Sequence, residues 1–401
     1  MSDEAGLQRV TRAGLATAGI VCAAVIVSHI FGRFTYSLLL PAISDDLVSS
    51  YTGAGFLGAS YFGGYLLGVL GVTMASARVE PVTLLRTGLG LSALAIGVLA
   101  TAPEFGVLAS GVFFAGMAGA GIWIPAPTIA TSRLPDRHRG LAIGALTASM
   151  GLGLLAVSQG TTAYRSIADD DGAWRQIFAI EAAVTVAILM GAVLLIRVPR
   201  GALVIERAPV FDLSGVRSIP DWALLTAAYT IFAILAGTWT QFFGVALEED
   251  GGFSRTHINN VFSAFAVAAI VGALSFGRLS DRIGRDRAIA IACSLCALGA
   301  ALVPLQREPF VTISALLYGA GSFAVPPLTA AAVRDHLEGR AFAAAFGAMT
   351  VVYASTSMVA AQLVGVLADA RGNFDLVYRL LAGFAVVAGA AAELRRRRLA
   401  G

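Results

Sequence analysis

Long apolar stretches alternate with short polar segments along the whole chain. Cutting the sequence at charge clusters and at proline or glycine breaks leaves apolar runs of about 20 residues, enough for a helix to cross a bilayer. The pattern predicts an all-α integral membrane protein with twelve transmembrane helices. We expect these helices at 14–41, 52–74, 82–102, 105–129, 140–164, 176–196, 221–247, 256–277, 287–305, 309–331, 341–367 and 376–394.

The composition favours a protein built for lipid. Of the 401 residues, 57% are hydrophobic and 13% are charged, whereas soluble domains carry about 25% charged residues. The 45 glycines suit close packing of transmembrane helices. The first apolar run is too long for the core of a signal peptide, so we expect it to be retained as a helix. All three cysteines (Cys22, Cys293 and Cys296) fall in apolar runs, which favours packing over metal or redox chemistry.

The basic residues, all of them arginines, gather in alternate connections between the apolar runs. With the N-terminus in the cytoplasm, most of them fall on the cytoplasmic face. The other face keeps few arginines and carries two acidic clusters, 169–171 and 248–250. Because cytoplasmic loops are enriched in arginine, we expect both termini in the cytoplasm and the protein in the inner (cytoplasmic) membrane of a bacterial-type cell.

One long polar connection divides the apolar runs into six and six. It spans 197–220 and contains three prolines, as in a linker. We therefore expect an N-terminal six-helix bundle at 1–196, a cytoplasmic linker at 197–220 and a C-terminal six-helix bundle at 221–401. An internal repeat supports this division: Gly119-Ala120-Gly121 with Pro127 recurs as Gly319-Ala320-Gly321 with Pro327.

The densest charge cluster is segment 277–287, GRLSDRIGRDR, which lies between two apolar runs. Its Gly-x-x-x-Asp-Arg-x-Gly-Arg spacing resembles the loop signature of the major facilitator superfamily of secondary transporters. The resemblance implies two parallel six-helix halves related by a pseudo-two-fold axis, with the substrate held between them. It also implies that the loop acts as a conformational latch between helices of one half, whereas the alternative is an element that only fixes topology. The latch residues would be Gly277, Asp281, Arg282, Gly284 and Arg285.

The latch has a physical basis in these residue types. Asp281 can pair with an arginine or with a helix N-terminus, and Gly277 and Gly284 allow tight turns and close helix contact. The matching loop of the first half, 71–78, has Ala75 where Asp281 would be expected. We therefore expect a lopsided latch that is stronger in the second half.

A single arginine, Arg33, lies well inside the first apolar run. A charge at membrane depth is costly, so it should face a cavity or a partner, and a guanidinium suits carboxylate, sulfonate or phosphate groups. By helical spacing, His29 and Tyr36 share its face. We predict that Arg33 binds an anionic substrate; the alternative is contact with backbone carbonyls or with Glu181. His29 is the candidate for proton coupling, or a hydrogen-bonding neighbour only.

Other polar and aromatic residues at membrane depth would complete a mostly apolar pocket with a few polar groups. For each of them, helix packing is the alternative role. Besides Arg33 and Tyr36, we predict as substrate-binding residues Tyr61, Tyr65, Trp123, Trp239, Gln241 and Tyr353. Weaker candidates of the same kind are Gln159, Asn259, Asn260, Tyr318 and Gln362.

A narrower resemblance rests on segments 31–41 and 59–68, which are similar to the YbfB/YjiJ-like subgroup of the superfamily. The sequence has no Gly-x-Ser-x-Gly elbow, no phosphate-binding loop and no cluster with metal-ligand spacing, so we expect no enzyme, cofactor or metal site. We predict a monomeric secondary transporter of a small organic anion, coupled to protons, surrounded by lipid and with no role in nucleic-acid binding. The arginines at 395–398 would bind anionic lipid.

Two alternatives remain open. The first is a proton-driven exporter of drug-like or apolar compounds in which Arg33 is structural. This chain offers an arginine where exporters of cationic drugs commonly place a carboxylate, which argues against that class. The second is a sensor derived from a transporter, which binds a ligand without moving it.

Overall fold

The chain folds into a bundle of long helices. The structure is a computed structural model that describes residues 12–76, 78–170, 172–196 and 213–400. Within them, 12 helical segments are long and apolar enough to cross a membrane, which confirms the predicted number. The largest differences from the predicted ends are six residues, where the spans end at Ile283 rather than 277 and at Ala400 rather than 394.

The first half runs from α1 to α8 and the second from α10 to α16, with short breaks inside several spans. The elements of the first half are α1 (Arg12–Ile26), η1 (Val27–Phe34), α2 (Thr35–Ser44), α3 (Tyr51–Ala75), α4 (Pro81–Ala100), α5 (Phe105–Trp123), α6 (Ala126–Thr131), α7 (Asp136–Ala168) and α8 (Trp174–Leu195). They are followed by α9 (Leu213–Arg217), α10 (Trp222–Glu249), α11 (Arg255–Ile283), α12 (Arg285–Leu302), η2 (Val303–Leu305), α13 (Phe310–Ser322), α14 (Val325–Arg334), α15 (Gly339–Arg371) and α16 (Asp375–Ala400).

Local sequence signals set several helix boundaries. The hydroxyls of Ser50 and Ser254 accept hydrogen bonds from backbone N–H groups in the first turns of α3 and α11, as N-caps do. Pro81 begins α4, where its missing N–H costs nothing. The turn between α11 and α12 is made at Gly284, whose φ of 89° favours glycine.

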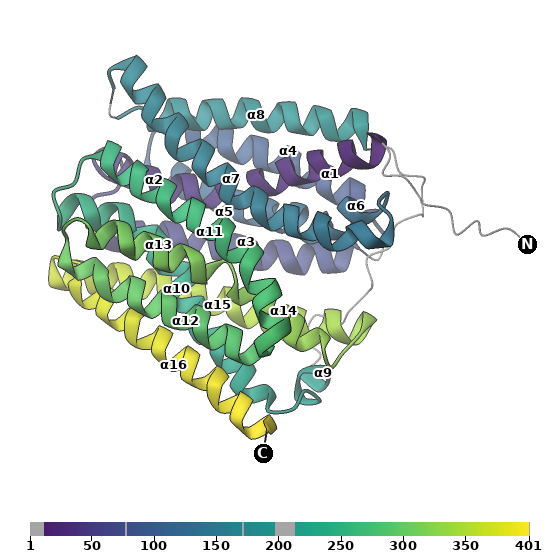
Figure 1. The fold of residues 1–401 in the computed structure, drawn as a ribbon. Coiled ribbons are helices and arrows are strands. Elements are labelled where there is room, and N and C mark those ends of the chain that lie inside the picture. The colour runs from purple at the N-terminus through teal and green to yellow at the C-terminus, as the bar shows by residue number, and fades with distance from the viewer. Residues whose placement is uncertain (1–11, 77, 171, 197–212, 401) are drawn as a thin grey trace, which may run out of the picture.

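The two halves form two bundles that lie against each other (Figure 1). The contacts between them run along α3 with α15, α7 with α11, and α2 with α10. In Figure 1 the bundles spread apart toward the side where α1 begins, α9 lies and α16 ends. We call this side the terminal face and the other side the opposite face.

Glycines allow the bundles to touch near the opposite face. A Cβ at Gly365 on α15 would lie 2.3 Å from the Tyr51 carbonyl oxygen, and one at Gly55 on α3 would lie 2.7 Å from the Ala361 oxygen. Both distances are too short for any side chain, so only glycine permits this crossing. The bundles are therefore in backbone contact where α3 begins and α15 ends.

The internal repeat corresponds to a shared feature of the two bundles. The fourth span breaks between Trp123 and Ala126, and the tenth breaks between Ser322 and Val325. Each break follows a Gly-Ala-Gly sequence and is accompanied by prolines, which remove backbone donors. Most of the predicted linker, 197–220, falls on 197–212, outside the described residues; α9 belongs to its remainder.

Candidate functional site

A cavity of about 310 Å³ lies between the two bundles near the middle of the spans. Residues of both bundles line it, and most of them are apolar or aromatic. None of its lining residues in the described part of the chain is an aspartate or a glutamate. The polar, histidine, arginine and tryptophan side chains that line it are His29, Arg33, Tyr61, Tyr65, Trp123, Thr147, Tyr229, Thr240, Tyr318, Ser322, Thr350 and Tyr353.

The cavity extends toward the terminal face. Ile143 and Thr147 line it from the beginning of α7, and Phe346 and Thr350 line it from the beginning of α15. Both helices start at the terminal face, so these residues belong to the halves of the spans nearest to it. The cavity therefore lies on the side where the bundles spread apart.

The opposite face is closed by polar contacts that cross between the bundles. Arg255 of α11 pairs with Asp45, which follows α2, and also with Glu248 at 2.9 Å. The carboxylate of Asp369 on α15 accepts hydrogen bonds from the first two backbone N–H groups of α3, at 2.9 and 2.7 Å. A carboxylate at a helix N-terminus is favoured by the helix dipole. These contacts hold the bundles together on this face.

Amide side chains join α7 to α11 in the same region. Gln159 donates a hydrogen bond to the Ser263 hydroxyl at 2.6 Å, and Asn259 donates one to the Thr162 hydroxyl at 2.8 Å. Both bonds cross between the bundles. The structure is thus in a conformation that is closed at the opposite face, with its cavity toward the terminal face.

The first span is not a regular α-helix where it borders the cavity. The segment η1 is a π-helix, in which hydrogen bonds join residues five apart, and it carries His29 and Arg33. Such segments are rare and are frequently found at functional sites. No feature of the sequence pattern signalled it.

Arg33 lies in the cavity wall and also makes a backbone contact of the kind that the sequence left open as its alternative role. It lines the cavity, and one guanidinium nitrogen donates a hydrogen bond to the Ala236 carbonyl of α10. Its guanidinium carbon also lies 4.9 Å from the centre of the Phe62 ring. The alternative pairing with Glu181 is absent among the described residues, because that carboxyl accepts a hydrogen bond from Thr35 at 2.6 Å instead.

His29 lies beside Arg33 in the cavity wall. Its Nδ1 is 2.5 Å from the Ser28 hydroxyl, and its ring meets Trp123 edge-on with centroids 4.6 Å apart. A protonated His29 would place a second positive charge next to Arg33, in a cavity whose described lining contains no carboxylate.

Six of the nine predicted site residues line the cavity: His29, Arg33, Tyr61, Tyr65, Trp123 and Tyr353. The other three pack between helices. The hydroxyl of Tyr36 and the amide of Gln241 both donate hydrogen bonds to the Ala54 carbonyl, at 3.2 and 2.8 Å. Trp239 is fully buried and stacks on Tyr318 with ring centroids 4.0 Å apart.

The expectation that Tyr36 shares a face with Arg33 was wrong for a local reason. The predicted spacing assumed α-helical hydrogen bonds, but those of η1 reach one residue farther. The residues that follow are therefore rotated relative to a regular helix, and Tyr36 points toward α3.

Sequence reasoning missed Tyr229 and Ser322 and ranked Tyr318 too low. Tyr318 and Ser322 are one turn apart on α13, both line the cavity, and both hydroxyls are buried without a partner among the described residues. Buried hydroxyls normally have a hydrogen-bond partner, so these two are available to a bound molecule. The available signal was the position of Ser322 next to the repeated Gly-Ala-Gly sequence.

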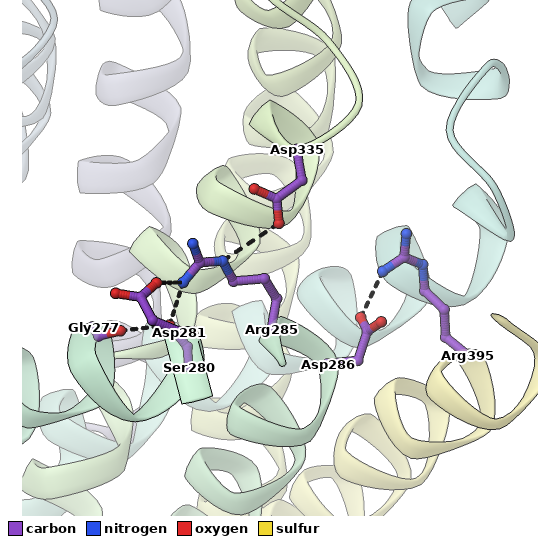
Figure 2. A network of polar contacts seen from close by, with 7 residues as sticks. All are labelled: Gly277, Ser280, Asp281, Arg285, Asp286, Asp335 and Arg395. Carbon is purple, nitrogen blue, oxygen red and sulfur yellow. Dashed lines mark hydrogen bonds and ion pairs between the residues drawn. The ribbon is translucent and has the colours of Figure 1, made fainter. Parts of the chain in front are cut away.

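The charged segment 277–287 is not a loop but the end of α11, the turn at Gly284 and the start of α12, and it ties parts of the second bundle together (Figure 2). Arg285 donates to Asp281 at 2.5 Å and reaches Asp335, at the end of α14, at 3.4 Å. The predicted pairing of Asp281 with an arginine is thus present, and Arg282 is exposed. The expected close helix contact at Gly277 was wrong, because a Cβ there would meet open space.

A second ion pair near this segment was not predicted. Arg395 is buried and donates to Asp286 at 2.6 Å (Figure 2). It also donates to the Pro220 carbonyl at 3.2 Å. The prediction that Arg395 binds lipid was therefore wrong. A run of arginines does not reveal which one faces the neighbouring helices, whereas the fold turns Arg395 inward and leaves Arg397 exposed.

Comparisons with known proteins agree with this architecture. The family model described as "Uncharacterised MFS-type transporter YbfB" matches residues 12–393. A crystal structure of a variant of the nucleoside transporter NupG is similar with a TM-score of 0.76 and 12% identity, over 95% of this chain and 98% of that one. A bacterial homologue of the human lysosomal transporter Spinster, in an inward-facing and unoccupied conformation, is similar with a TM-score of 0.74 and 16% identity, over 96% of both chains. At these identities the structural likeness establishes the fold.

Proposed function

Because the chain belongs to the YbfB-like family of major facilitator superfamily transporters, we propose that this secondary transporter carries a small organic anion. Transport proceeds by alternating access, in which the two bundles rock around a site between them. The cavity described above is that site.

The charge of the cavity wall is the observation that carries the proposal. Arg33 supplies a guanidinium, and the described lining contains no carboxylate to neutralise it. Only one hydrogen bond from Arg33 is made within the described residues, to the Ala236 carbonyl. The guanidinium can therefore meet an anionic group through its remaining donors.

The rest of the cavity wall suits an aromatic or otherwise apolar body. Five tyrosines line the cavity with phenylalanine and proline side chains, and ligand pockets commonly combine such walls with a few polar groups. The hydroxyls of Tyr318 and Ser322, which have no partner within the described ranges, would bind a second polar group on the same molecule.

The topology proposal follows the arginine distribution. The terminal face corresponds to the cytoplasm, so both termini lie inside and the cavity is in its inward-open state. We assign the protein to the inner membrane of a bacterial-type cell, as a monomer whose transport is coupled to protons.

A green fluorescent protein fused to the C-terminus tests the orientation. The fusion should fluoresce, because that protein folds in the cytoplasm, and a fusion that is expressed normally but does not fluoresce would contradict this orientation.

A thermal-shift screen of the purified protein tests the substrate class. The panel contains benzoate, aliphatic carboxylates, aryl sulfonates and quaternary ammonium ions. We expect aromatic anions to stabilise the wild type and to lose that effect with Arg33→Gln. A hydrogen bond to a charged group contributes about 1.5–3 kcal/mol, so its loss should weaken the affinity roughly 10- to 150-fold. The best binder is then tested for uptake into proteoliposomes.

Two further variants make the screen specific. Arg33→Lys keeps the charge but not the planar fork and should bind more weakly than the wild type. Arg379→Ala removes an exposed arginine of α16 and should bind like the wild type. Stabilisation by cations alone, or equal binding by Arg33→Gln, would overturn the anion proposal.

The apolar lining also favours a second candidate, a proton-driven exporter of drug-like or apolar compounds. In that case Arg33 serves mainly to contact the Ala236 carbonyl. If Arg33→Ala still transports an apolar dye, the exporter is supported. If Arg33→Ala loses the transport of anions, the leading proposal is supported. Ligand binding with no flux of any kind would point to a sensor.

A further inference from the structure

A carboxyl group is buried within the first bundle, away from the cavity wall. Glu181 lies on α8 and is 4% exposed. One of its oxygens accepts the hydrogen bond from Thr35, and the other, Oε2, is buried with no hydrogen-bond partner among the residues that the structure describes. It is seven residues from the start of α8 at Trp174, about 10 Å along the helix axis, which places it in the half of the bundle nearest the opposite face.

No positive charge in the described part of the chain pairs with Glu181 in this conformation. It forms no ion pair among the described residues, although α8 packs against α1, η1, α2 and α4. The arginine of α4, Arg86, binds the last carbonyls of α8 instead, and Arg175 at the other end pairs with Asp46.

The other titratable groups on these elements are also directed elsewhere. His29 and Arg33 of η1 line the cavity, and the Tyr36 hydroxyl of α2 donates to the Ala54 carbonyl. Cys22 of α1 is a free, half-buried thiol, and Arg12 stands at the first residue of α1. A carboxylate at membrane depth with an unpaired oxygen is far more costly than a neutral carboxyl in the same place, so burial favours the protonated form.

The position of the carboxyl links it to the substrate site. Its partner Thr35 is the residue directly after η1, and Arg33 is two residues earlier. A change at the Thr35–Glu181 hydrogen bond therefore acts on the end of the π-helix that carries Arg33. Because α2 and α10 are in contact, it also acts on an interface between the bundles.

From this geometry we propose that Glu181 is the proton-binding site of the transporter and that Thr35 transmits its protonation state to η1. A proton adds to Oε2 and neutralises one negative charge. The carboxyl holds the proton while it is sealed in the present conformation, and it exchanges the proton when α2 and α8 admit water. This proposal rests on the transporter function proposed above and assigns the coupling role to Glu181 rather than to His29.

Two measurements test the proposal, and neither of them needs a substrate. The first is an infrared titration of the protein in lipid, which reports protonated carboxyl groups by their C=O band. We expect a carboxyl band at neutral pH that disappears in Glu181→Gln and persists in Glu249→Gln, a control at an exposed glutamate of α10. Identical spectra of the wild type and Glu181→Gln at all pH values would overturn the proposal.

The second measurement follows the opposite face. Nitroxide labels on Ser49→Cys and Asn373→Cys, both exposed in the loops of that face, report the separation of the bundles in a background without native cysteines. We expect the label distances to change with pH in the wild type and in Glu249→Gln. In Glu181→Gln the label distances should keep the low-pH distribution at every pH. A pH response of Glu181→Gln equal to that of the wild type would also overturn the proposal.

Variants of Thr35 test the transmitting role. Thr35→Val should keep the infrared band but lose the pH response of the labels, while Thr35→Ser should keep both. A full label response in Thr35→Val would contradict the role of this residue. Glu181→Leu gives a second neutral side chain, so that a folding defect of one variant does not decide the outcome.

These results separate the proton site from the substrate class. If anions bind through Arg33 but Glu181→Gln retains the pH response, the proton site fails and the proposed function stands. If the labels and the infrared band depend on Glu181 but no anion binds, the anion proposal fails and the proton site stands.

Discussion

The two faces of the protein use their charged residues in different ways. At the opposite face, Arg255 with Asp45 and Asp369 with the start of α3 join one bundle to the other. At the terminal face, Arg285 with Asp335 and Arg395 with Asp286 join parts of the second bundle to each other. The contacts at the opposite face can break when the bundles rock, whereas those at the terminal face stay intact because both partners belong to the same bundle.

Burial separates Arg395–Asp286 from the other pairs, since Arg285 and Asp335 at the terminal face are themselves 28% and 50% exposed. The side chain of Asp45 is 67% exposed, whereas those of Arg395 and Asp286 are 2% and 10% exposed. Exposed ion pairs contribute about 0–1 kcal/mol, but breaking a buried pair costs about 3–5 kcal/mol. The opposite face is therefore joined by a partly exposed ion pair that can break in each transport cycle, whereas the buried Arg395–Asp286 pair stabilises the fold of the second bundle.

The largest effect is expected from Arg395→Ala. Asp286 would keep a buried charge without its partner, so we expect a loss of about 3 kcal/mol in the free energy of unfolding. Thermal unfolding in detergent measures it, and the labels at Ser49→Cys and Asn373→Cys should report an unchanged state. Arg397→Ala, at a 71% exposed position, is the control and should change stability by less than about 0.5 kcal/mol. Equal losses of stability in Arg395→Ala and Arg397→Ala would contradict the comparison between buried and exposed ion pairs.

The next largest effect is expected from a substitution that forces the bundles apart at the opposite face. It should change the conformational equilibrium rather than the stability of the fold. In Gly365→Ala the new Cβ would lie 2.3 Å from the Tyr51 carbonyl oxygen, so α3 and α15 must separate. Overpacking of this kind costs about 1–3 kcal/mol, here mainly in the closed conformation. We expect roughly a tenfold shift toward the conformation open at the opposite face, seen in the label distances. Gly383→Ala, where a Cβ meets open space, should leave the distances unchanged.

Asp369→Asn should shift the same equilibrium less. The substitution keeps an acceptor for the N–H groups of α3 but removes the charge at the helix N-terminus, which is worth about 0.3–1 kcal/mol. We expect a shift of about two- to fivefold toward the open conformation that fades at high salt. The distance between the labels at Ser49→Cys and Asn373→Cys measures it, and a shift independent of salt would argue against an electrostatic contact.

The smallest effect on stability is expected for Asp281→Asn. This side chain is 65% exposed, so its pair with Arg285 should contribute less than about 1 kcal/mol. If segment 277–287 is a latch, the rate of substrate exchange in proteoliposomes should still change, because the interaction is made and broken during the cycle. An unchanged rate together with unchanged stability would leave only the topological role of the segment.

Much of the fold was predictable because the membrane constrains it. Apolar runs long enough to cross a bilayer can only form helices there, so the number of spans and most of their ends followed from hydropathy. The repeated Gly-Ala-Gly…Pro sequence likewise marked the two broken helices beside the cavity. Charge at membrane depth led directly to Arg33 and His29.

The remaining site residues depended on side-chain direction, which spacing did not give. Tyr36, Trp239 and Gln241 have the residue types of a binding site, but they pack between helices. Ser322 has an ordinary type and lines the cavity. The run at 395–398 hid one buried arginine among exposed ones, because only the packing of α16 decides which side of the helix faces its neighbours.

The sequence by itself determined that this chain is a twelve-helix membrane protein of the transporter type, with one arginine deep in its first span. The reason is that few structures can place a polar backbone or a charge in lipid at low cost, and each of them requires a recognisable pattern of apolar and charged residues. Only the tertiary structure decided which face is closed and that a π-helix carries Arg33. It also decided that Glu181 lies buried beside Thr35 rather than paired with Arg33. These features arise from contacts between segments far apart in the chain, and no local pattern encodes them.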